Sequence, residues 1–309
     1  MARIGIEIGG SKLQSAIVAA DGAVLLKETA RAPAAAGAAA IRDVLAEQLR
    51  RLLDAWGGRA PLEAAGIGFG GPVNRRLGTV AASFHVAGWA EFPLVAWAME
   101  QLGGLPTVIE NDTNAAALAE ATLGAGRGRR IVVYSNSGRG IGGGLVIDGR
   151  LYHGGSVTEM EIGHLRLSPQ GGITEDVASG WSIDRRVRAH VATDADGTLA
   201  RLTAAGHPGA RALLAASAAG DTAAAMILDE AARHYAVALS HAVQLLAPEV
   251  IVLGGGVAEM GEAWRGRVAR HLPRLLMPPL QPGPDVLLAA LGADVVPVGA
   301  ALVASTACR

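Results

Sequence analysis

The sequence predicts an α/β protein made of two domains with related cores. The chain has 309 residues, 50% of them hydrophobic, which is enough to fill two cores of ordinary size. Short apolar strands alternate with helical patterns, as expected of α/β proteins. One pattern of strand, glycine-rich turn, strand and Asp-Gly turn occurs twice, ending first at Asp21-Gly22 and then at Asp148-Gly149. Such self-similarity indicates a duplicated domain.

Each copy opens with a predicted β-hairpin whose strands are joined by a glycine-rich turn. Glycine tolerates the backbone angles of tight turns, so backbone N–H groups are left free there. In the first copy the turn occupies residues 9–12, and the strands are expected over 4–8, 13–20 and 23–29. In the second copy the turn runs from Gly138 to Gly144, and the strands are expected over 131–135 and 145–147.

Further helices and strands follow from periodicity and capping residues. Apolar residues from Ile41 to Trp56 recur at helical spacing and predict an amphipathic helix that covers a sheet and ends at Gly57-Gly58. Asp221 is the predicted N-cap of a helix that reaches Leu246. Residues 300–304 are expected in a final helix that returns to the first domain. Single strands are predicted over 64–69, 107–110 and 250–253, and a helix over 115–123.

The composition argues against nucleic acid, membranes and disulfides. With 27 Lys and Arg against 28 Asp and Glu, the net charge is -1, so no basic surface for a phosphate backbone or anionic lipid is expected. The apolar segments are interrupted by charges and the first residues do not resemble a signal peptide, which predicts a soluble cytoplasmic protein. Cys308 is the only cysteine, so neither a disulfide framework nor a cysteine-rich zinc site is expected. A small soluble ligand is the expected partner.

Three glycine-rich turns directly follow apolar strands and point to phosphate binding, because free N–H groups in such turns bind phosphate oxygens. A chain with 42 glycines also places glycines in ordinary turns, so one turn alone leaves both interpretations open. Three turns at strand ends favour a nucleotide site, although no Walker-type P-loop is present. The residues are Gly9, Gly10, Ser11 and Lys12; Gly138, Arg139 and Gly140; and Gly254, Gly255 and Gly256. Asn111 and Asp112 also follow a strand at its carboxyl end, where ligands bind in open α/β sheets.

Several motifs, in the same order along nearly the whole chain, resemble those of the ROK family of sugar kinases, within the actin/hexokinase-like ATPase superfamily. Glu7 to Lys12 and Gly138 to Gly144 resemble its two phosphate motifs, and Gly68 to Val73 its characteristic turn. Its catalytic segment is similar to Glu110-Asn111-Asp112-Thr113-Asn114. Its sugar-binding elements are similar to Glu161-Ile162-Gly163-His164 and to Glu175 followed by Ala178-Ser179-Gly180.

The resemblance implies two actin-like (ribonuclease H-like) domains, with ATP and sugar meeting in a cleft between them. The first domain is then expected over residues 1–115, with a C-terminal helix over about 297–309 returning to it. The second is expected over residues 116–296. The resemblance also implies a homodimer.

The implied reaction is phosphoryl transfer with ATP and Mg²⁺, in which positioning and charge neutralisation supply most of the catalysis. Asp112 is the expected base, because a carboxylate can accept the proton of the attacking hydroxyl. The alternative is that Asp112 only caps the helix that follows. Contacts to sugar hydroxyls are expected from Gly71, His85, Asn111, Glu161, His164 and Glu175. The alternative role for the two glutamates Glu161 and Glu175 is that of solvated surface charges.

Four features depart from the family's usual pattern. Glu7 replaces an Asp that is expected to act on Mg²⁺ through water, Arg139 replaces a Thr beside the phosphates, and His85 replaces an Asn that contacts sugar. The family's cysteine-rich zinc loop is absent, since residues 165–172 contain no cysteine, and no structural zinc is expected. Other contacts must then position the sugar-binding residues nearby.

The sequence thus predicts an ATP-dependent kinase that acts on a hydroxyl of a hexose, an amino sugar or a sugar-like cyclitol. The alternative is a non-catalytic sugar sensor or pseudokinase of the same fold, in which Glu7 and Arg139 neutralise each other in the phosphate site. The repressor branch of the family is not expected, because a helix-turn-helix needs residues before the first strand, which begins at Ile4.

Overall fold

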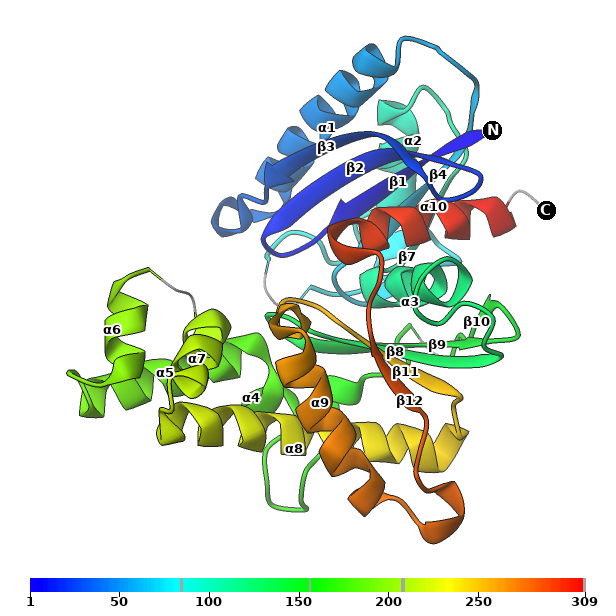
Figure 1. Ribbon diagram of the computed structural model, residues 1–309. Helices are drawn as coiled ribbons and strands as arrows, with labels where there is room; N and C mark the ends of the chain where they lie inside the picture. The colour runs from blue at the N-terminus through cyan, green and yellow to red at the C-terminus, as the bar shows by residue number, and fades with distance from the viewer. Residues whose placement is uncertain (84–85, 156, 207–208, 308–309) are drawn as a thin grey trace. The chain divides into compact units, whose positions relative to one another are not determined.

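The computed structural model describes residues 1–83, 86–155, 157–206 and 209–307. His85 and Cys308 therefore lie outside the described residues. The chain divides into two compact units, each assembled from separate segments (Figure 1). The first unit comprises Met1–Gly128, Gly144–Glu159 and Ala290–Arg309, and the second comprises Arg129–Gly143 and Met160–Ala289.

The first unit contains a sheet with the strand order β3-β2-β1-β4-β7. Strands β3, β2 and β1 are antiparallel neighbours, and β4 and β7 continue the sheet parallel to β1. Burial follows from the sequence, since the apolar β4 is buried along most of its length whereas β3 alternates between exposed and partly buried residues. The strands are β1 (Ala2–Ile8), β2 (Lys12–Ala19), β3 (Val24–Arg31), β4 (Leu62–Phe69) and β7 (Thr107–Asn111), with a short separate pair of β5 (Val73–Asn74) and β6 (Thr79–Val80).

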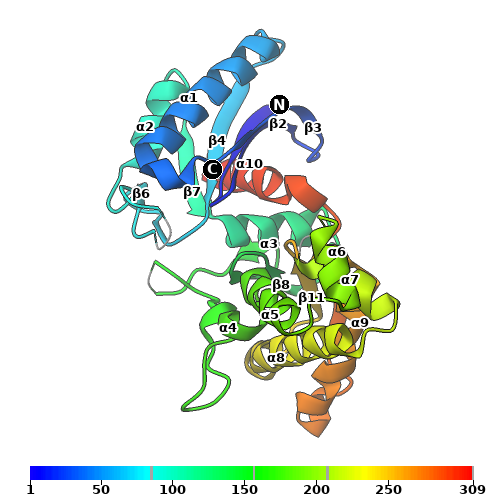
Figure 2. The same cartoon turned by 90° about the vertical axis from the view of Figure 1, so that its left-hand side faces the viewer.

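Helices cover both faces of this sheet. Helices α1 and α2 lie on one face, and α10 lies on the other together with α3 (Figure 2). Helix α10 packs directly on the sheet backbone: a Cβ at Gly5 would lie 1.8 Å from the carbonyl oxygen of Pro297, and one at Gly66 would lie 1.9 Å from that of Ala300. Only glycine permits this close approach. The helices are α1 (Gly37–Trp56), α2 (Leu94–Gln101), α3 (Asp112–Thr122) and α10 (Val295–Ala307).

Two predicted helices of this unit are confirmed. Helix α1 buries Ile41, Leu45, Leu49 and Leu52 in the core and ends at Gly57, whose φ of 59° is left-handed. Burial of each such side chain contributes about 1.5–3 kcal/mol, so packing rather than intrinsic propensity holds the helix in place. The predicted final helix is present as α10, which packs against β1 and β4.

The second sheet has the order β10-β9-β8-β11-β12. In each sheet the strand that comes first in the sequence, β1 or β8, lies in the centre, and the third, β3 or β10, lies at one edge. This shared order is what a duplicated domain predicts. Strands β8, β11 and β12 are parallel and belong to the second unit, whereas β9 passes from the second unit into the first at Gly144. The strands are β8 (Ile131–Ser137), β9 (Ile141–Ile147), β10 (Arg150–Leu151), β11 (Val250–Gly254) and β12 (Asp285–Leu288).

The long helix α8 is the centre of the helical part of the second unit, because α5, α7 and α9 pack against it (Figure 2). Asp221 caps α8 as predicted, since its side chain accepts a hydrogen bond from the N–H of Ala224 at 3.0 Å. Among the described residues, no helix is long and apolar enough to span a membrane. The helices are α4 (Glu175–Ala178), α5 (Gly180–Thr193), α6 (Thr198–Ala204), α7 (Gly209–Ala218), α8 (Thr222–Leu246) and α9 (Glu262–His271). Short 3₁₀ helices are η1 (Ala34–Ala36), η2 (Ile162–His164), η3 (Ala258–Met260), η4 (Leu272–Leu275), η5 (Pro278–Leu280) and η6 (Gly292–Asp294).

Candidate active site

The parallel strands β1, β4 and β7 of the first unit end at the same edge of the sheet. Ile8 at the end of β1 pairs with Phe69 at the end of β4, and Phe69 pairs with Asn111 at the end of β7. The residues that follow are therefore neighbours: a Cβ at Gly70 would lie 3.3 Å from Oδ2 of Asp112. The fold thus brings the first glycine turn to the same sheet edge as the predicted base.

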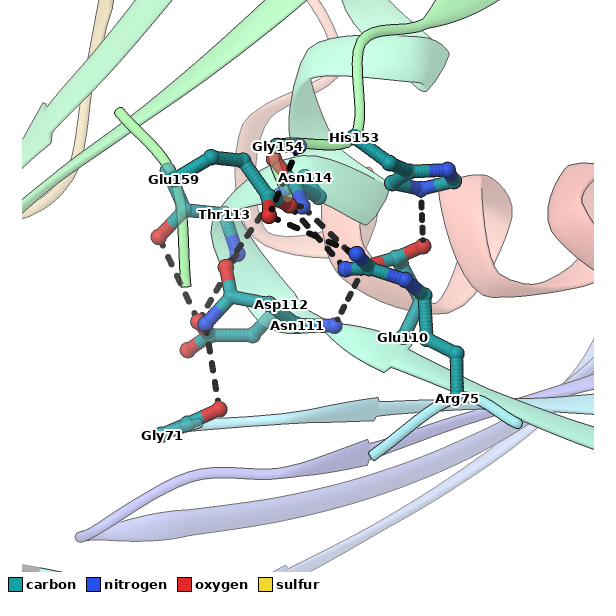
Figure 3. A network of polar contacts seen from close by, with 10 residues as sticks. All are labelled: Gly71, Arg75, Glu110, Asn111, Asp112, Thr113, Asn114, His153, Gly154 and Glu159. Atoms are coloured by element: carbon teal, nitrogen blue, oxygen red, sulfur yellow. Dashed lines mark hydrogen bonds and ion pairs between the residues drawn. The ribbon is translucent and has the colours of Figure 1, made fainter. Parts of the chain in front are cut away.

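Asn111, and not Asp112, is the N-cap of α3. Its Oδ1 accepts hydrogen bonds from the N–H groups of Thr113 at 2.9 Å and Asn114 at 3.1 Å (Figure 3). Its Nδ2 donates to the carbonyl oxygen of Gly71 at 3.3 Å, which ties the turn after β4 to the helix. The helix begins at Asp112, three residues before the predicted start, because Asn111 satisfies its first free N–H groups.

The carboxyl group of Asp112 is a weaker acid than an ordinary aspartate. Its pKa is raised to about 7, mainly by burial and also by the negative charge of Glu7, although hydrogen bonds from Thr113 oppose the shift. Oδ1 accepts from the N–H of Thr113 at 2.7 Å, which orients the carboxyl group. A carboxylate with a pKa near neutrality is well matched to accepting a proton from a hydroxyl.

The turn between β1 and β2 is closed by a hydrogen bond from the N–H of Gly9 to the carbonyl oxygen of Lys12 at 3.0 Å. Gly10 and Ser11, at its tip, are exposed. The Nζ of Lys12 forms an ion pair with Oε2 of Glu7 at 2.8 Å and donates to the carbonyl oxygen of Ala293 at 3.1 Å. Burial raises the pKa of Glu7, although Lys12 opposes the shift. The predicted phosphate-binding lysine thus has two partners within its own unit.

The other two glycine turns meet in the second unit, at the ends of the neighbouring strands β8 and β11. Gly255 adopts a φ of 81°, and a Cβ there would lie 2.6 Å from the carbonyl oxygen of Ser137 at the end of β8. Gly138 accepts a hydrogen bond from the N–H of Gly180, the first residue of α5, at 2.7 Å. Arg139 is exposed beside Gly140, and Gly254 ends β11. A Cβ at Gly256 would meet open space. Backbone N–H groups and a helix N-terminus gathered in this way are typical of anion sites.

Residues Gly142 to Gly144, predicted to belong to the second glycine turn, lie instead in β9. Their small size serves packing, since a Cβ at Gly143 would lie 2.4 Å from the carbonyl oxygen of Met160. Likewise a Cβ at Gly163 would lie 2.3 Å from the carbonyl oxygen of Ile141. The glycines therefore let the segment with the predicted sugar ligands pack closely on β9.

The predicted sugar ligands of the second unit lie on three short elements. Glu161 precedes the 3₁₀ helix η2, His164 ends it, and both are exposed. Glu175 begins α4, and its Oε2 accepts a hydrogen bond from the N–H of Ile141 at 2.8 Å. Glu175 thereby contacts the residue that follows the second glycine turn. The remaining predicted ligand, His85, lies outside the described residues.

Hydrogen bonds close the segment where the family has its cysteine-rich loop. The Oγ1 and N–H of Thr174 both donate to the carbonyl oxygen of Leu165, at 3.0 and 2.9 Å. The N–H of Leu167 donates to the carbonyl oxygen of Gly172 at 3.2 Å. Thr174 is fully buried, and its two bonds to Leu165 hold both ends of the segment together.

Sequence reasoning missed a polar network around Glu110 in the first unit (Figure 3). The Glu110 side chain is 1% exposed, and its Oε1 accepts from Arg75 at 3.2 Å and Asn114 at 3.0 Å. Nε2 of His153 lies 2.8 Å from Oε2. Burial raises the pKa of Glu110, but hydrogen bonds from His153 and Asn114 outweigh it, so the net pKa is lowered. The available signal was a charged residue in an apolar strand, which requires buried partners.

Glu110, His153 and Glu159 each offer one donor atom within 4.8 Å of the others, a spacing that suits a metal ion. A cation is already there, because the Arg75 guanidinium lies 3.2 Å from Glu110 and 3.0 Å from Glu159. Arg75 neutralises the two carboxylates, and the cluster therefore gives no support to a metal centre.

The repeated sheets and their covering helices are those of a two-domain, actin-like ATPase fold. A solved ROK family glucokinase from Streptomyces griseus, in complex with glucose and AMPPNP, superposes with a TM-score of 0.86 and 29% identity, covering 99% of this chain and 100% of that one. The expected fold class is thus confirmed.

The chain belongs to the ROK family, whose profile matches residues 3–307. It is 32% identical to a glucokinase from Streptomyces coelicolor, with 96% of each chain covered. It is 31% identical to an N-acetylmannosamine kinase from Escherichia coli, with 98% of each covered. With family membership, these similarities over nearly the full length assign the chain as a carbohydrate kinase.

Proposed function

We propose that this kinase transfers the γ-phosphoryl group of ATP to a hydroxyl group of a hexose or an amino sugar, with Asp112 as the base. The observation that carries the proposal is the division of roles at the start of α3. Asn111 caps the helix, so Asp112 is not needed for that purpose, and burial raises the pKa of Asp112 to about 7. Such a carboxylate accepts a hydroxyl proton readily at neutral pH.

The glycine turns and Glu7 would hold the nucleotide and its metal. Backbone N–H groups in the turns at residues 139–140 and 255–256 would suit the phosphate oxygens of ATP, whereas the N–H of Gly138 already donates to the carbonyl oxygen of Gly140 at 2.8 Å. Glu7 would hold Mg²⁺ through water, and the charge repulsion that raises the pKa of Asp112 would be relieved by a divalent cation nearby. Bound Mg²⁺ neutralises charge on the transferring phosphoryl group. The proposal includes a cytoplasmic location, where ATP is supplied, and a homodimer, which light scattering tests.

The sensor alternative has Glu7 and Arg139 neutralising each other in the phosphate site. The pairing of Glu7 with Lys12 at 2.8 Å in its own hairpin favours the kinase instead. A kinase and a sensor differ in turnover, so the discriminating measurement is sugar-dependent ADP release.

The test measures ADP release with glucose, mannose, N-acetylmannosamine, N-acetylglucosamine and myo-inositol, each with and without Mg²⁺. At least one hexose or amino sugar is expected to stimulate release in the parent chain and not in Asp112→Asn. If no sugar stimulates ADP release but calorimetry shows that a sugar binds, the result would support the sensor and contradict the kinase. Stimulation by myo-inositol alone would move the substrate class to cyclitols.

A further inference from the structure

Arg75 joins two buried carboxylates that are far apart in the sequence. Its Nη1 lies 3.2 Å from Oε1 of Glu110 and 3.0 Å from Oε1 of Glu159, and its Nη2 lies 3.4 Å from Oε2 of Glu159 (Figure 3). The side chains of Glu110 and Glu159 are 1% and 5% exposed. Two carboxylates that are this close and this well shielded from water repel each other strongly unless a cation lies between them.

Asn114 makes a second bridge between the same two carboxylates. Its Nδ2 donates to Oε1 of Glu110 at 3.0 Å and to Oε1 of Glu159 at 2.6 Å. Asn114 lies in the first turn of α3, and Glu110 also accepts from the N–H of Asn111. Glu159 is thereby fastened to the end of β7 and the start of α3, which carry Asn111 and Asp112.

The segment that ends at Glu159 is held at both ends. His153 contacts Glu110 at its beginning, and the N–H of Gly154 donates to Oε2 of Glu159 at 3.3 Å across it. Glu159 is the last residue of this segment in the first unit. The next residue, Met160, adopts a φ of 54°, a conformation that a non-glycine residue keeps only where its surroundings enforce it.

Glu161 and His164 follow directly after this turn. We infer that Arg75 and Glu159 are positioning residues for sugar binding: they fix the backbone two residues before Glu161, and so orient the start of the segment that carries Glu161 and His164. The inference rests on the proposed function, in which these two residues contact sugar hydroxyls. Neither Arg75 nor Glu159 is required to touch the substrate.

Two variants test this. Glu159→Gln keeps the shape but removes the charge and turns an NH₂ group toward Arg75 or Asn114. Arg75→Lys keeps the charge but lacks the planar fork that reaches both carboxylates. The matched control is Glu47→Gln, which breaks the exposed ion pair of Glu47 with Arg50 on α1.

Each variant is expected to raise the KM for sugar, and the calorimetric Kd, by about tenfold or more, since small displacements of binding groups are costly. The KM for ATP should stay unchanged, and Glu47→Gln should match the parent. A merely structural role would lower kcat in proportion to the folded fraction and leave the KM for sugar unchanged, which would overturn the inference. If Glu159→Gln does not fold, Arg75→Lys carries the test. A parent chain that neither binds nor phosphorylates any sugar would instead overturn the proposed function itself.

Discussion

The carboxylate of Glu120 accepts hydrogen bonds from the backbone N–H of Ala290, at 3.0 and 3.1 Å to its two oxygens. The same group accepts from the N–H of Leu291 at 2.9 Å and of Ala125 at 2.8 Å, and the side chain is fully buried. Ala290 is the first residue of the segment that returns to the first unit. Glu120 therefore fastens this segment to the end of α3, just before α10 begins.

Replacing Glu120 by Gln should destabilise the protein by about 2–3 kcal/mol, because an NH₂ group would then face buried N–H donors. Urea unfolding followed by circular dichroism measures the change. The exposed Glu47→Gln variant serves as the control and should leave the free energy of unfolding nearly unchanged. Equal effects of the two substitutions would contradict the fastening role.

Asp112→Asn should remove nearly all turnover while sugar and nucleotide binding remain, because the shape is kept and the proton acceptor is lost. In the parent chain, the pKa of about 7 predicts that kcat falls about tenfold per pH unit below neutrality, as the base becomes protonated. Initial-rate assays from pH 5 to pH 9 measure kcat for the parent and the variant, and calorimetry measures sugar and nucleotide binding. A variant with near-normal kcat would exclude Asp112 as the base.

The same carboxyl group should make stability depend on pH. Its pKa is raised from 3.8 to about 7 on folding, so between these values the folded protein keeps a proton that the unfolded chain releases. The free energy of unfolding therefore falls as pH rises through this window. Asp112→Asn has no carboxyl group to titrate, so its free energy of unfolding should not fall in this window. Because each unit of pKa shift corresponds to about 1.4 kcal/mol, the variant should be more stable than the parent at pH 8 by a few kcal/mol. Thermal melts at pH 4 and pH 8 check this, and a difference independent of pH would contradict it.

Arg139→Thr, which restores the residue usual in the family, tests whether the exposed cation assists nucleotide binding. Because a guanidinium suits phosphate oxygens, loss of Arg139 should weaken ATP binding by about tenfold. Calorimetric titration with a non-hydrolysable ATP analogue measures the affinity, and Arg274→Thr on η4 provides an exposed arginine control. A gain of ATP affinity in Arg139→Thr would mean that the arginine blocks the site.

The purified protein should contain no stoichiometric zinc, because one cysteine cannot build the usual cysteine-rich site. The hydrogen bonds of Thr174 to Leu165 supply a closure that needs no metal. Elemental analysis should find less than one zinc per chain, and EDTA should leave the Tm unchanged in the absence of ATP. Thr174→Val, in contrast, should lower the Tm, since it removes the hydrogen bond from the buried Thr174 side chain to the carbonyl oxygen of Leu165.

Local patterns in the sequence were sufficient for much of the fold. The helix from Ile41 to Trp56, the cap at Asp221 and the repeated hairpins depend on spacing and on residues close in the chain. Periodic burial and capping act over a few residues, so a single sequence carries them. The order of the motifs along the chain likewise indicates the family.

Only the tertiary structure decided which polar groups become partners. Asn111 rather than Asp112 caps α3, Glu7 pairs with Lys12, and Gly143 makes room for Met160 instead of joining a phosphate turn. The contacts of Arg75 with Glu159 and of Glu120 with Ala290 join residues distant in the chain. The sequence shows that a buried charge needs a partner, because its desolvation is costly. Which partner satisfies it depends on the packing of strands and helices far apart in sequence, and that packing appears only in the folded chain.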